Sequence, residues 1–177
     1  MRTIAVALLA FASTNLDDFF LLTLWFVKRT SPKIVALGQM AGFTAIILIS
    51  VLGYFGTMLL PPSYIHWLGV LPITIGIKQL WSKRKDEHPP ADNWWVVAAV
   101  TAAHGGDNIA VYTPLFARYA LGDVALIIVC FYAALLLSVE VARIVAGKLA
   151  PAERFHKLAH LVSPFVIMLI GVGILLS

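Results

Sequence analysis

The sequence predicts an all-α membrane protein, and three observations carry that prediction. Hydrophobic residues make up 60% of the 177 residues and charged residues only 12%, whereas soluble domains carry about 25% charged residues. Six apolar segments approach or exceed the roughly 20 residues that a helix needs to cross a bilayer. No segment alternates polar and apolar residues as a membrane β-strand does. We therefore expect six transmembrane helices in a single domain, residues 1–177, with no separate soluble catalytic module.

The six predicted helices follow one another closely along the chain. Short connections rich in proline or charge separate them, such as "KRTSPK" and "SKRKDEHPPADN", and such residues interrupt helices. The first segment also fits a secretory signal peptide with a cleavage site at Ala10-Phe11-Ala12, but its apolar run resumes at once through "FFLLTLWFV", which favours a retained transmembrane helix. The predicted helices cover residues 4–27, 34–60, 64–81, 94–117, 121–146 and 158–177.

The distribution of Lys and Arg predicts the orientation, because basic residues concentrate in cytoplasmic loops. Of the 13 basic residues, Arg2 and Arg118 fall on one side of the predicted bundle and eleven fall on the other. Both termini are therefore expected outside the cytoplasm. The eleven residues of the cytoplasmic side are Lys28, Arg29, Lys33, Lys78, Lys83, Arg84, Lys85, Arg143, Lys148, Arg154 and Lys157.

A weak internal repeat relates the two halves of the chain. A shift of 90 residues aligns "TNLDDFFLLTLWF", which begins at Thr14, with "HGGDNIAVYTPLF", which begins at His104. The shift places Asp17 on Asp107, and the next residue of each half is also polar. Each half contains three predicted helices, and an odd number inverts the second half relative to the first. We expect two inverted three-helix repeats, residues 1–85 and 91–177, whose polar centres meet near the membrane midplane.

The polar residues in these two segments are costly at membrane depth. Each Asp costs about 3 kcal/mol at the centre of a membrane helix, so three cost on the order of 10 kcal/mol, which indicates a ligand or a proton. With about 100° of rotation per residue, the polar residues of each segment share one face of a helix. Carboxylate and amide oxygens suit divalent cations, and neighbouring carboxylates repel one another unless a cation or protons intervene. The candidate metal-binding residues are Asp17, Asp18, Asp107, Asn108, Asn15, His104 and Thr14.

Other residues have simpler structural interpretations. Gly105-Gly106 either unwinds the fourth helix locally, which would free carbonyl groups for an ion, or allows a close helix crossing. Gly38-x-x-x-Gly42 is typical of a helix-packing motif. Gln39, between the two glycines, is a candidate hydrogen-bond donor to the residues that bind the metal. Glu140 and Arg143, three residues apart, predict an ion pair. The single cysteine, Cys130, excludes an internal disulfide and is expected to pack as a small hydrophobic residue.

The segments "NLDDFFLLTLWF", "GQMAG", "LPITIGIKQL" and "HGGDNIAVYTPLF" together resemble the cadmium-resistance transporter family of the CadD type, within the lysine-exporter superfamily. The likeness runs in order over most of the chain, and its most specific part is Gly-Asp-Asn-Ile followed by Pro-Leu-Phe. The resemblance implies efflux of a divalent metal across a bacterial cytoplasmic (inner) membrane by a multi-pass protein. It also implies that Asp17, Asp107 and Asn108 are the matching motif positions.

The sequence therefore predicts a secondary transporter that exports divalent metal cations by alternating access, with proton antiport as the expected coupling. Because cadmium prefers thiolate and oxygen ligands suit magnesium, calcium or manganese, the metal stays open among cadmium, zinc and manganese. The alternative cargo is an amino acid or another small organic cation. An enzyme, a resident cofactor and a nucleic-acid partner are not expected. The expected partners are the metal ion and the lipid bilayer, and the small-residue faces permit a homodimer without requiring one.

Overall fold

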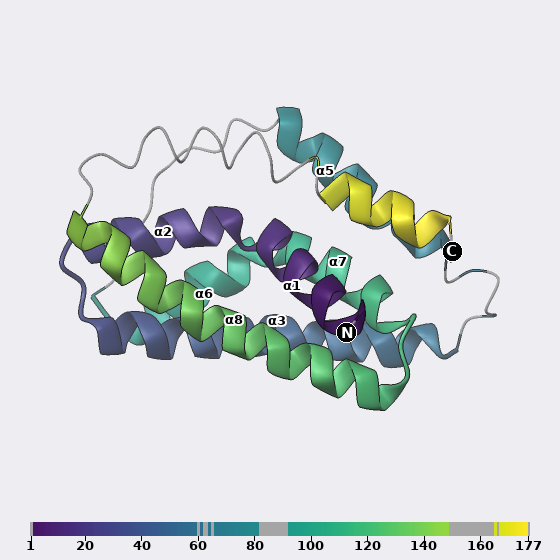
Figure 1. Cartoon of the computed structure of the whole chain (residues 1–177), viewed down its shortest axis with the longest axis horizontal. Helices are drawn as coiled ribbons and strands as arrows, with labels where there is room; N and C mark the ends of the chain where they lie inside the picture. The colour runs from purple at the N-terminus through teal and green to yellow at the C-terminus, as the bar shows by residue number, and fades with distance from the viewer. Residues whose placement is uncertain are drawn as a thin grey trace.

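The computed structural model describes residues 2–59, 61, 64, 66–81, 92–148, 165 and 167–176, and every regular element in this part of the chain is a helix. The expected all-α class is therefore confirmed. Figure 1 shows the long helices α3 and α8 running along the longest axis, with the shorter helices packed beside them. The elements are α1 (Arg2–Thr14), α2 (Leu16–Val27), α3 (Pro32–Thr57), the 3₁₀ helix η1 (His66–Gly69), α5 (Val70–Trp81), α6 (Trp94–His104), α7 (Gly106–Phe116) and α8 (Leu121–Lys148).

Within the described residues, two helices are each long and apolar enough to cross a membrane. They are Pro32–Thr57 and Leu121–Gly147, and they match the segments predicted over 34–60 and 121–146. The pair α1 and α2 qualifies as a third span if the two are counted together. The shorter apolar helices include Trp67–Lys78 and Trp94–His104. Six spans and their inverted repeat remain a prediction, and of the sixth segment, 158–177, the structure describes residue 165 and residues 167–176.

The first predicted helix, 4–27, is not continuous. It breaks at Asn15, where φ is −110° and ψ is 11°, and α1 and α2 meet there at a bend of 59°. Three consecutive polar side chains cause the interruption. Ser13 Oγ and Thr14 Oγ1 both donate to the Ala10 carbonyl, and Asn15 Nδ2 donates to the Phe11 carbonyl. Such side-chain bonds compete with the helix ladder, and the sequence prediction of one straight helix did not account for them.

A second break separates α6 from α7 at Gly105, where φ is −73° and ψ is 13°. The predicted interruption at Gly105-Gly106 is therefore present, with Gly106 already the first residue of α7. The close-crossing alternative is present too. A Cβ atom on Gly105 would lie 2.2 Å from Ile46 Cδ1 of α3, so only glycine allows α3 to approach this closely.

Gly38 and Gly42 bring α3 against α6, so the helix-packing role predicted for this motif is confirmed and its partner is α6. A Cβ atom on Gly38 would lie 2.4 Å from Val97 Cβ, and one on Gly42 would lie 2.6 Å from the Ala98 carbonyl oxygen. Beside this contact, Thr101 Oγ1 donates to Gln39 Oε1 at 2.9 Å, with both side chains buried. The crossing fixes the end of α6 that leads into the second break.

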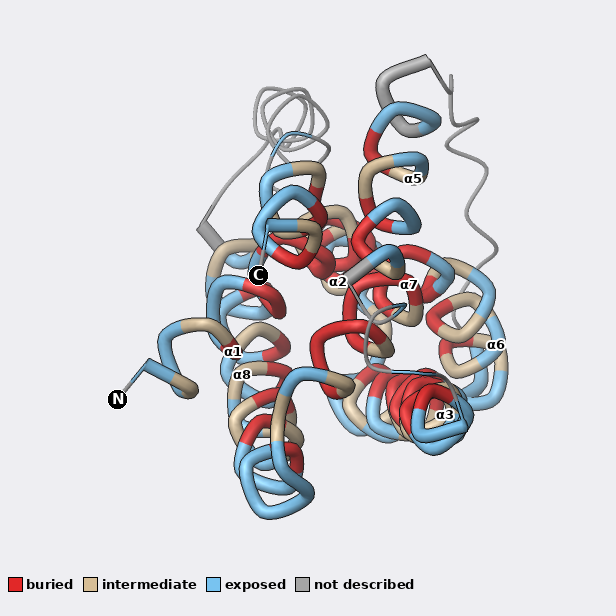
Figure 2. The backbone as a smooth tube through the Cα atoms, turned by 90° about the vertical axis from the view of Figure 1, so that its right-hand side faces the viewer, coloured by how far each residue is buried: buried red, intermediate tan, exposed pale blue. Residues whose placement is uncertain are grey.

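The hydrophobic core divides into two clusters, and each break lies on the border between them. The larger cluster, which we name the aromatic cluster, takes α1 and α7 together with parts of α3 and α8, and contains Phe11, Phe43, Tyr112, Phe116 and Phe131. The smaller one, the aliphatic cluster, takes α2 and α6, and contains Leu21, Leu22, Trp25, Val35, Val97, Val139 and Ala142. Figure 2 shows the buried residues on the faces that these helices turn toward one another. Each broken helix thus contributes one half to each cluster.

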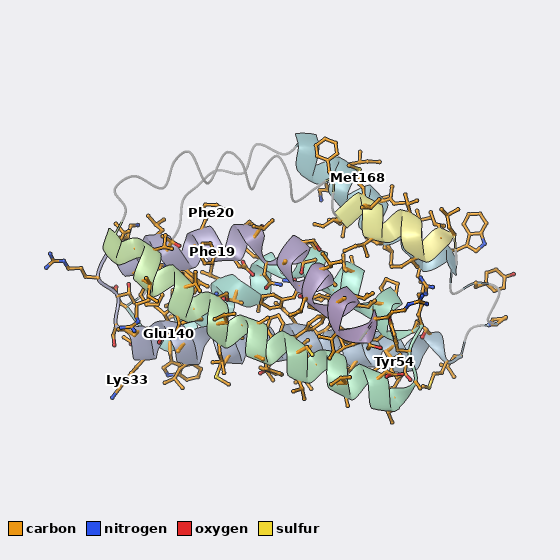
Figure 3. All side chains as sticks on the ribbon, in the orientation of Figure 1. Phe19, Phe20, Lys33, Tyr54, Glu140 and Met168 are labelled. Carbon is orange, nitrogen blue, oxygen red and sulfur yellow. The ribbon has the colours of Figure 1, made fainter. Side chains whose placement is uncertain are left out.

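The two ends of the long axis differ in charge. Figure 3 places Lys33 and Glu140 at one end and Tyr54 toward the other. Arg143 Nε and Glu140 Oε2 form the predicted ion pair at 2.8 Å, with both side chains exposed. Lys28 and Arg29 lie in the turn that precedes α3. This basic end is the one that the sequence assigns to the cytoplasm.

Candidate functional site

The polar residues predicted as a site gather at the two breaks. Thr14, Asn15 and Asp18 are buried around the first break, at 1%, 7% and 6% exposure. Asp107 and Asn108 are buried in the first turn of α7, at 4% and 1% exposure. The other two predicted residues, Asp17 and His104, are half-buried. Carboxyl and amide groups are rarely buried to this extent unless they have partners or a ligand.

A direct hydrogen bond joins the two breaks. Asn15 Nδ2 donates to Asn108 Oδ1 at 3.2 Å. The same nitrogen donates to the Tyr112 hydroxyl at 2.8 Å, and that hydroxyl lies 2.9 Å from Thr14 Oγ1. Residues separated by more than 90 positions in the sequence therefore meet side chain to side chain at the point where both helices are interrupted.

The buried carboxylates stand in the first turns of the two half-helices that start at the breaks. Asp17 and Asp18 occupy the first turn of α2, and Asp107 occupies the first turn of α7. The Asn108 backbone amide donates to Asp107 Oδ1 at 2.9 Å. The N-terminal end of a helix favours negative charge, so each half-helix supports its own carboxylate.

The carboxylates do not form a closed ligand cluster in this conformation. Among the described residues, no group of three or more His, Cys, Asp or Glu side chains is close enough to hold a metal ion. The contacts between the halves are instead made by amides and hydroxyls. His104 is tied to its own helix, since its Nδ1 donates to the Val100 carbonyl at 2.8 Å. Cys130 is half-buried against the aromatic cluster, as expected for a packing residue.

The sequence interpretation missed Tyr112, the residue at the centre of these contacts. It is fully buried, at 0% exposure, and under the 90-residue shift it aligns with the apolar Leu22, so the repeat gave no signal for it. A different signal was present. Tyr112 follows Asn108 by four residues, and residues four apart share one face of a helix, which puts its hydroxyl on the polar face.

The sequence model of the family described as cadmium resistance transporter matches residues 11–177. The chain belongs to the cadmium resistance transporter family. The matched range contains both breaks and all seven predicted site residues. No significant match to this cadmium resistance transporter was found among curated proteins or among solved structures. The family, together with the apolar helices, makes the chain a membrane transporter for metal efflux.

Proposed function

We propose that this transporter exports divalent metal cations and binds them where its two broken helices meet. The observation that carries the proposal is the hydrogen bond between Asn15 and Asn108, which joins the two breaks. The helix that follows each break carries a buried carboxylate in its first turn, Asp18 in α2 and Asp107 in α7. Broken helices near the middle of a membrane are a common way to build an ion site in transporters.

The residues divide by chemistry. Asp17, Asp18 and Asp107 supply negative charge, and their oxygens suit a divalent cation. Asn15 and Asn108 supply neutral oxygen ligands. His104 can contribute its Nε2 atom, because the bond to the Val100 carbonyl holds the proton on Nδ1. Thr14 supports the site through its hydrogen bond to the Tyr112 hydroxyl.

A bound cation would allow carboxylates from both breaks to lie close together. Like charges at close range repel, so the acidic groups move together only when a cation or protons compensate them. Exchange of one divalent ion for protons on the same carboxylates provides the coupling. Cadmium, zinc and manganese are all candidate cargoes, and a site of oxygen ligands favours the harder ions.

Alternating access follows from the arrangement of the breaks. Asn15 and Gly105 are 90 residues apart, the same offset that relates the two polar segments, and this supports a six-helix protein made of two inverted repeats. The aromatic cluster then closes the outer side of the site and the aliphatic cluster closes the cytoplasmic side. Rocking of one repeat against the other opens one cluster at a time. In a bacterial inner membrane with both termini outside, the basic end faces the cytoplasm.

Transport into proteoliposomes tests the proposal. Protein reconstituted in vesicles is given Cd²⁺, Mn²⁺, Zn²⁺ or lysine, with a pH-sensitive dye trapped inside. We expect uptake of divalent metal with an opposing proton flux in the wild type, and its loss in Asp107→Asn. Asp123→Asn is the matched control, because Asp123 is an exposed carboxylate in the first turn of α8 and its removal should leave transport unchanged.

The same experiment separates the rival cargo. Transport of lysine without any metal would contradict the metal proposal and support the organic-cation alternative. Metal transport that is equal in wild type and Asp107→Asn would place the site elsewhere in the chain.

A further inference from the structure

The Tyr112 hydroxyl lies at the centre of a buried hydrogen-bond network in which the donor and the acceptor of each bond can be assigned. Asn15 Nδ2 is 2.8 Å from the hydroxyl oxygen and donates to it. A tyrosine hydroxyl carries one proton, and Thr14 Oγ1, at 2.9 Å, is the neighbour that can accept it. Thr14 in turn sends its own proton to the Ala10 carbonyl at 3.0 Å. The chain of donors therefore starts at Asn15 and ends on the backbone of α1.

This direction fixes which way the Asn15 amide faces. The Phe11 carbonyl lies 2.9 Å from Asn15 Nδ2, and a carbonyl oxygen can only accept a hydrogen bond. A flipped amide would set two acceptors against each other at that distance. The amide nitrogen is therefore held toward Phe11 and Tyr112, and Asn15 Oδ1 faces the opposite way. Asn15 is 7% exposed, and this oxygen accepts no hydrogen bond from the residues that the structure describes.

We propose that Tyr112 is a positioning residue that holds Asn15 Oδ1 ready to bind the transported cation. The inference rests on the function proposed above and adds a residue outside the predicted ligand set. An oxygen whose amide is already fixed loses little freedom when a metal binds. Groups that orient a metal ligand in this way commonly change metal affinity by about 10- to 100-fold when they are removed.

The network also assigns a role to Thr14. Its hydroxyl oxygen accepts from the Tyr112 hydroxyl at 2.9 Å, and its own proton goes to the Ala10 carbonyl at 3.0 Å. Thr14 therefore supports the positioning of Asn15 through the Tyr112 hydroxyl.

The surrounding aromatic side chains hold the Tyr112 ring independently of its hydroxyl. The ring lies 4.3 Å from that of Phe131 and 6.2 Å from those of Phe43 and Phe116. A Tyr112→Phe substitution keeps these contacts and removes only the hydroxyl. The variant therefore isolates the hydrogen bonds to Asn15 and Thr14.

Titration of Cd²⁺ and Mn²⁺ into purified, detergent-solubilised protein tests the inference. We expect Tyr112→Phe to raise the Kd for both ions about tenfold, while the maximal transport rate in proteoliposomes stays within about twofold because the carboxylates are untouched. In an Asn15→Ala background, Tyr112→Phe should have no further effect on the Kd, since the hydroxyl acts through that amide. Thr14→Ser should bind metal as the wild type does, whereas Thr14→Val should resemble Tyr112→Phe.

Tyr132→Phe is the matched control. The Tyr132 hydroxyl also makes a partly buried hydrogen bond, to Thr44 Oγ1 at 2.8 Å, which joins α8 to α3. None of the hydrogen bonds of Asn15 involves Tyr132. Its removal should leave the Kd unchanged. An unchanged Kd in both Tyr112→Phe and Thr14→Val, or an equal loss in Tyr132→Phe, would overturn the role of Tyr112. Absence of any metal binding by the wild type would instead contradict the proposed function itself.

Discussion

The two breaks are built in different ways. At the first break the interrupting residue, Asn15, is itself a candidate ligand, and its side chain uses its nitrogen to bind protein while its oxygen stays available. At the second break Gly105 makes room for Ile46, and the polar chemistry begins two residues later. Asn108 shows the reverse pattern to Asn15, because its oxygen is used and its buried Nδ2 has no partner among the described residues.

Because of this difference, the Asn15 side chain at the first break is held in one orientation, whereas the Asn108 side chain at the second break can reorient. An unsatisfied buried donor costs about 1 to 3 kcal/mol, so the Asn108 amide gains by rotating when a ligand arrives, whereas the Asn15 amide is already held. Substitutions at the first break should act mainly on metal affinity. Substitutions at Gly105 should act mainly on stability.

The largest expected effect is the loss of a buried carboxylate from either half. Asp18→Asn and Asp107→Asn should each weaken Cd²⁺ binding by about 100-fold, since a close charge-assisted contact is worth up to about 3 kcal/mol. Asp17→Asn should cost less, because Asp17 is less deeply buried than Asp18 and Asp107 and solvent weakens the contacts of a partly exposed charge. The Kd from calorimetric titration measures all three. A strong effect from only one of the two buried residues would show that the halves do not share the ion.

The Gly105 packing contact gives the next effect. A residue with φ of −73° accepts alanine without backbone strain, so only packing decides the outcome. A Cβ atom 2.2 Å from Ile46 Cδ1 should lower stability by about 1 to 3 kcal/mol, seen as a lower Tm in detergent. The Kd of the folded protein should stay close to that of the wild type.

Two comparisons control the Gly105→Ala prediction. Gly106→Ala should leave the Tm unchanged or raised, because nothing lies within 4 Å of its Cβ position. In an Ile46→Ala background, Gly105→Ala should cost nothing further. A Tm loss at Gly106 equal to that at Gly105 would attribute the effect to helix geometry rather than to the contact with α3.

The smallest effect concerns the turn between α2 and α3, which lies away from both breaks. Arg29 has a φ of 61°, in the left-handed region that favours glycine. Arg29→Gly should therefore be more stable than Arg29→Ala by about 1 kcal/mol, although both variants lose the same charge. Thermal unfolding in detergent compares them. Equal Tm values would show that this turn relaxes without strain.

The sequence could predict the parts of the fold that depend on composition and spacing. Hydropathy located α3 and α8, and the Gly38-x-x-x-Gly42 spacing predicted a close helix packing without naming its partner, which is α6. The two polar segments that the 90-residue shift aligns lie at the two breaks. The break at Asn15 could not be read in the same way. It depends on side chains that turn back onto the carbonyls of Ala10 and Phe11, a choice between helix and side-chain bonds that local composition does not decide.

The residue types of the candidate site could be read from the sequence, whereas its contacts could not. The carboxylates could be recognised in the sequence because a membrane helix rarely carries them. Tyr112 could not be recognised in this way, since a tyrosine in an apolar helix is ordinary. Its role follows only from the contact between α1 and α7.

Anomalous X-ray scattering from crystals soaked with Cd²⁺ tests the central claim most directly. We predict one strong peak bonded to oxygen atoms from both half-helices, with Asp18 on α2 and Asp107 on α7 among the ligands and Asn15 Oδ1 facing the ion. A peak at Cys130, or one bonded to residues of a single half, would contradict the shared site.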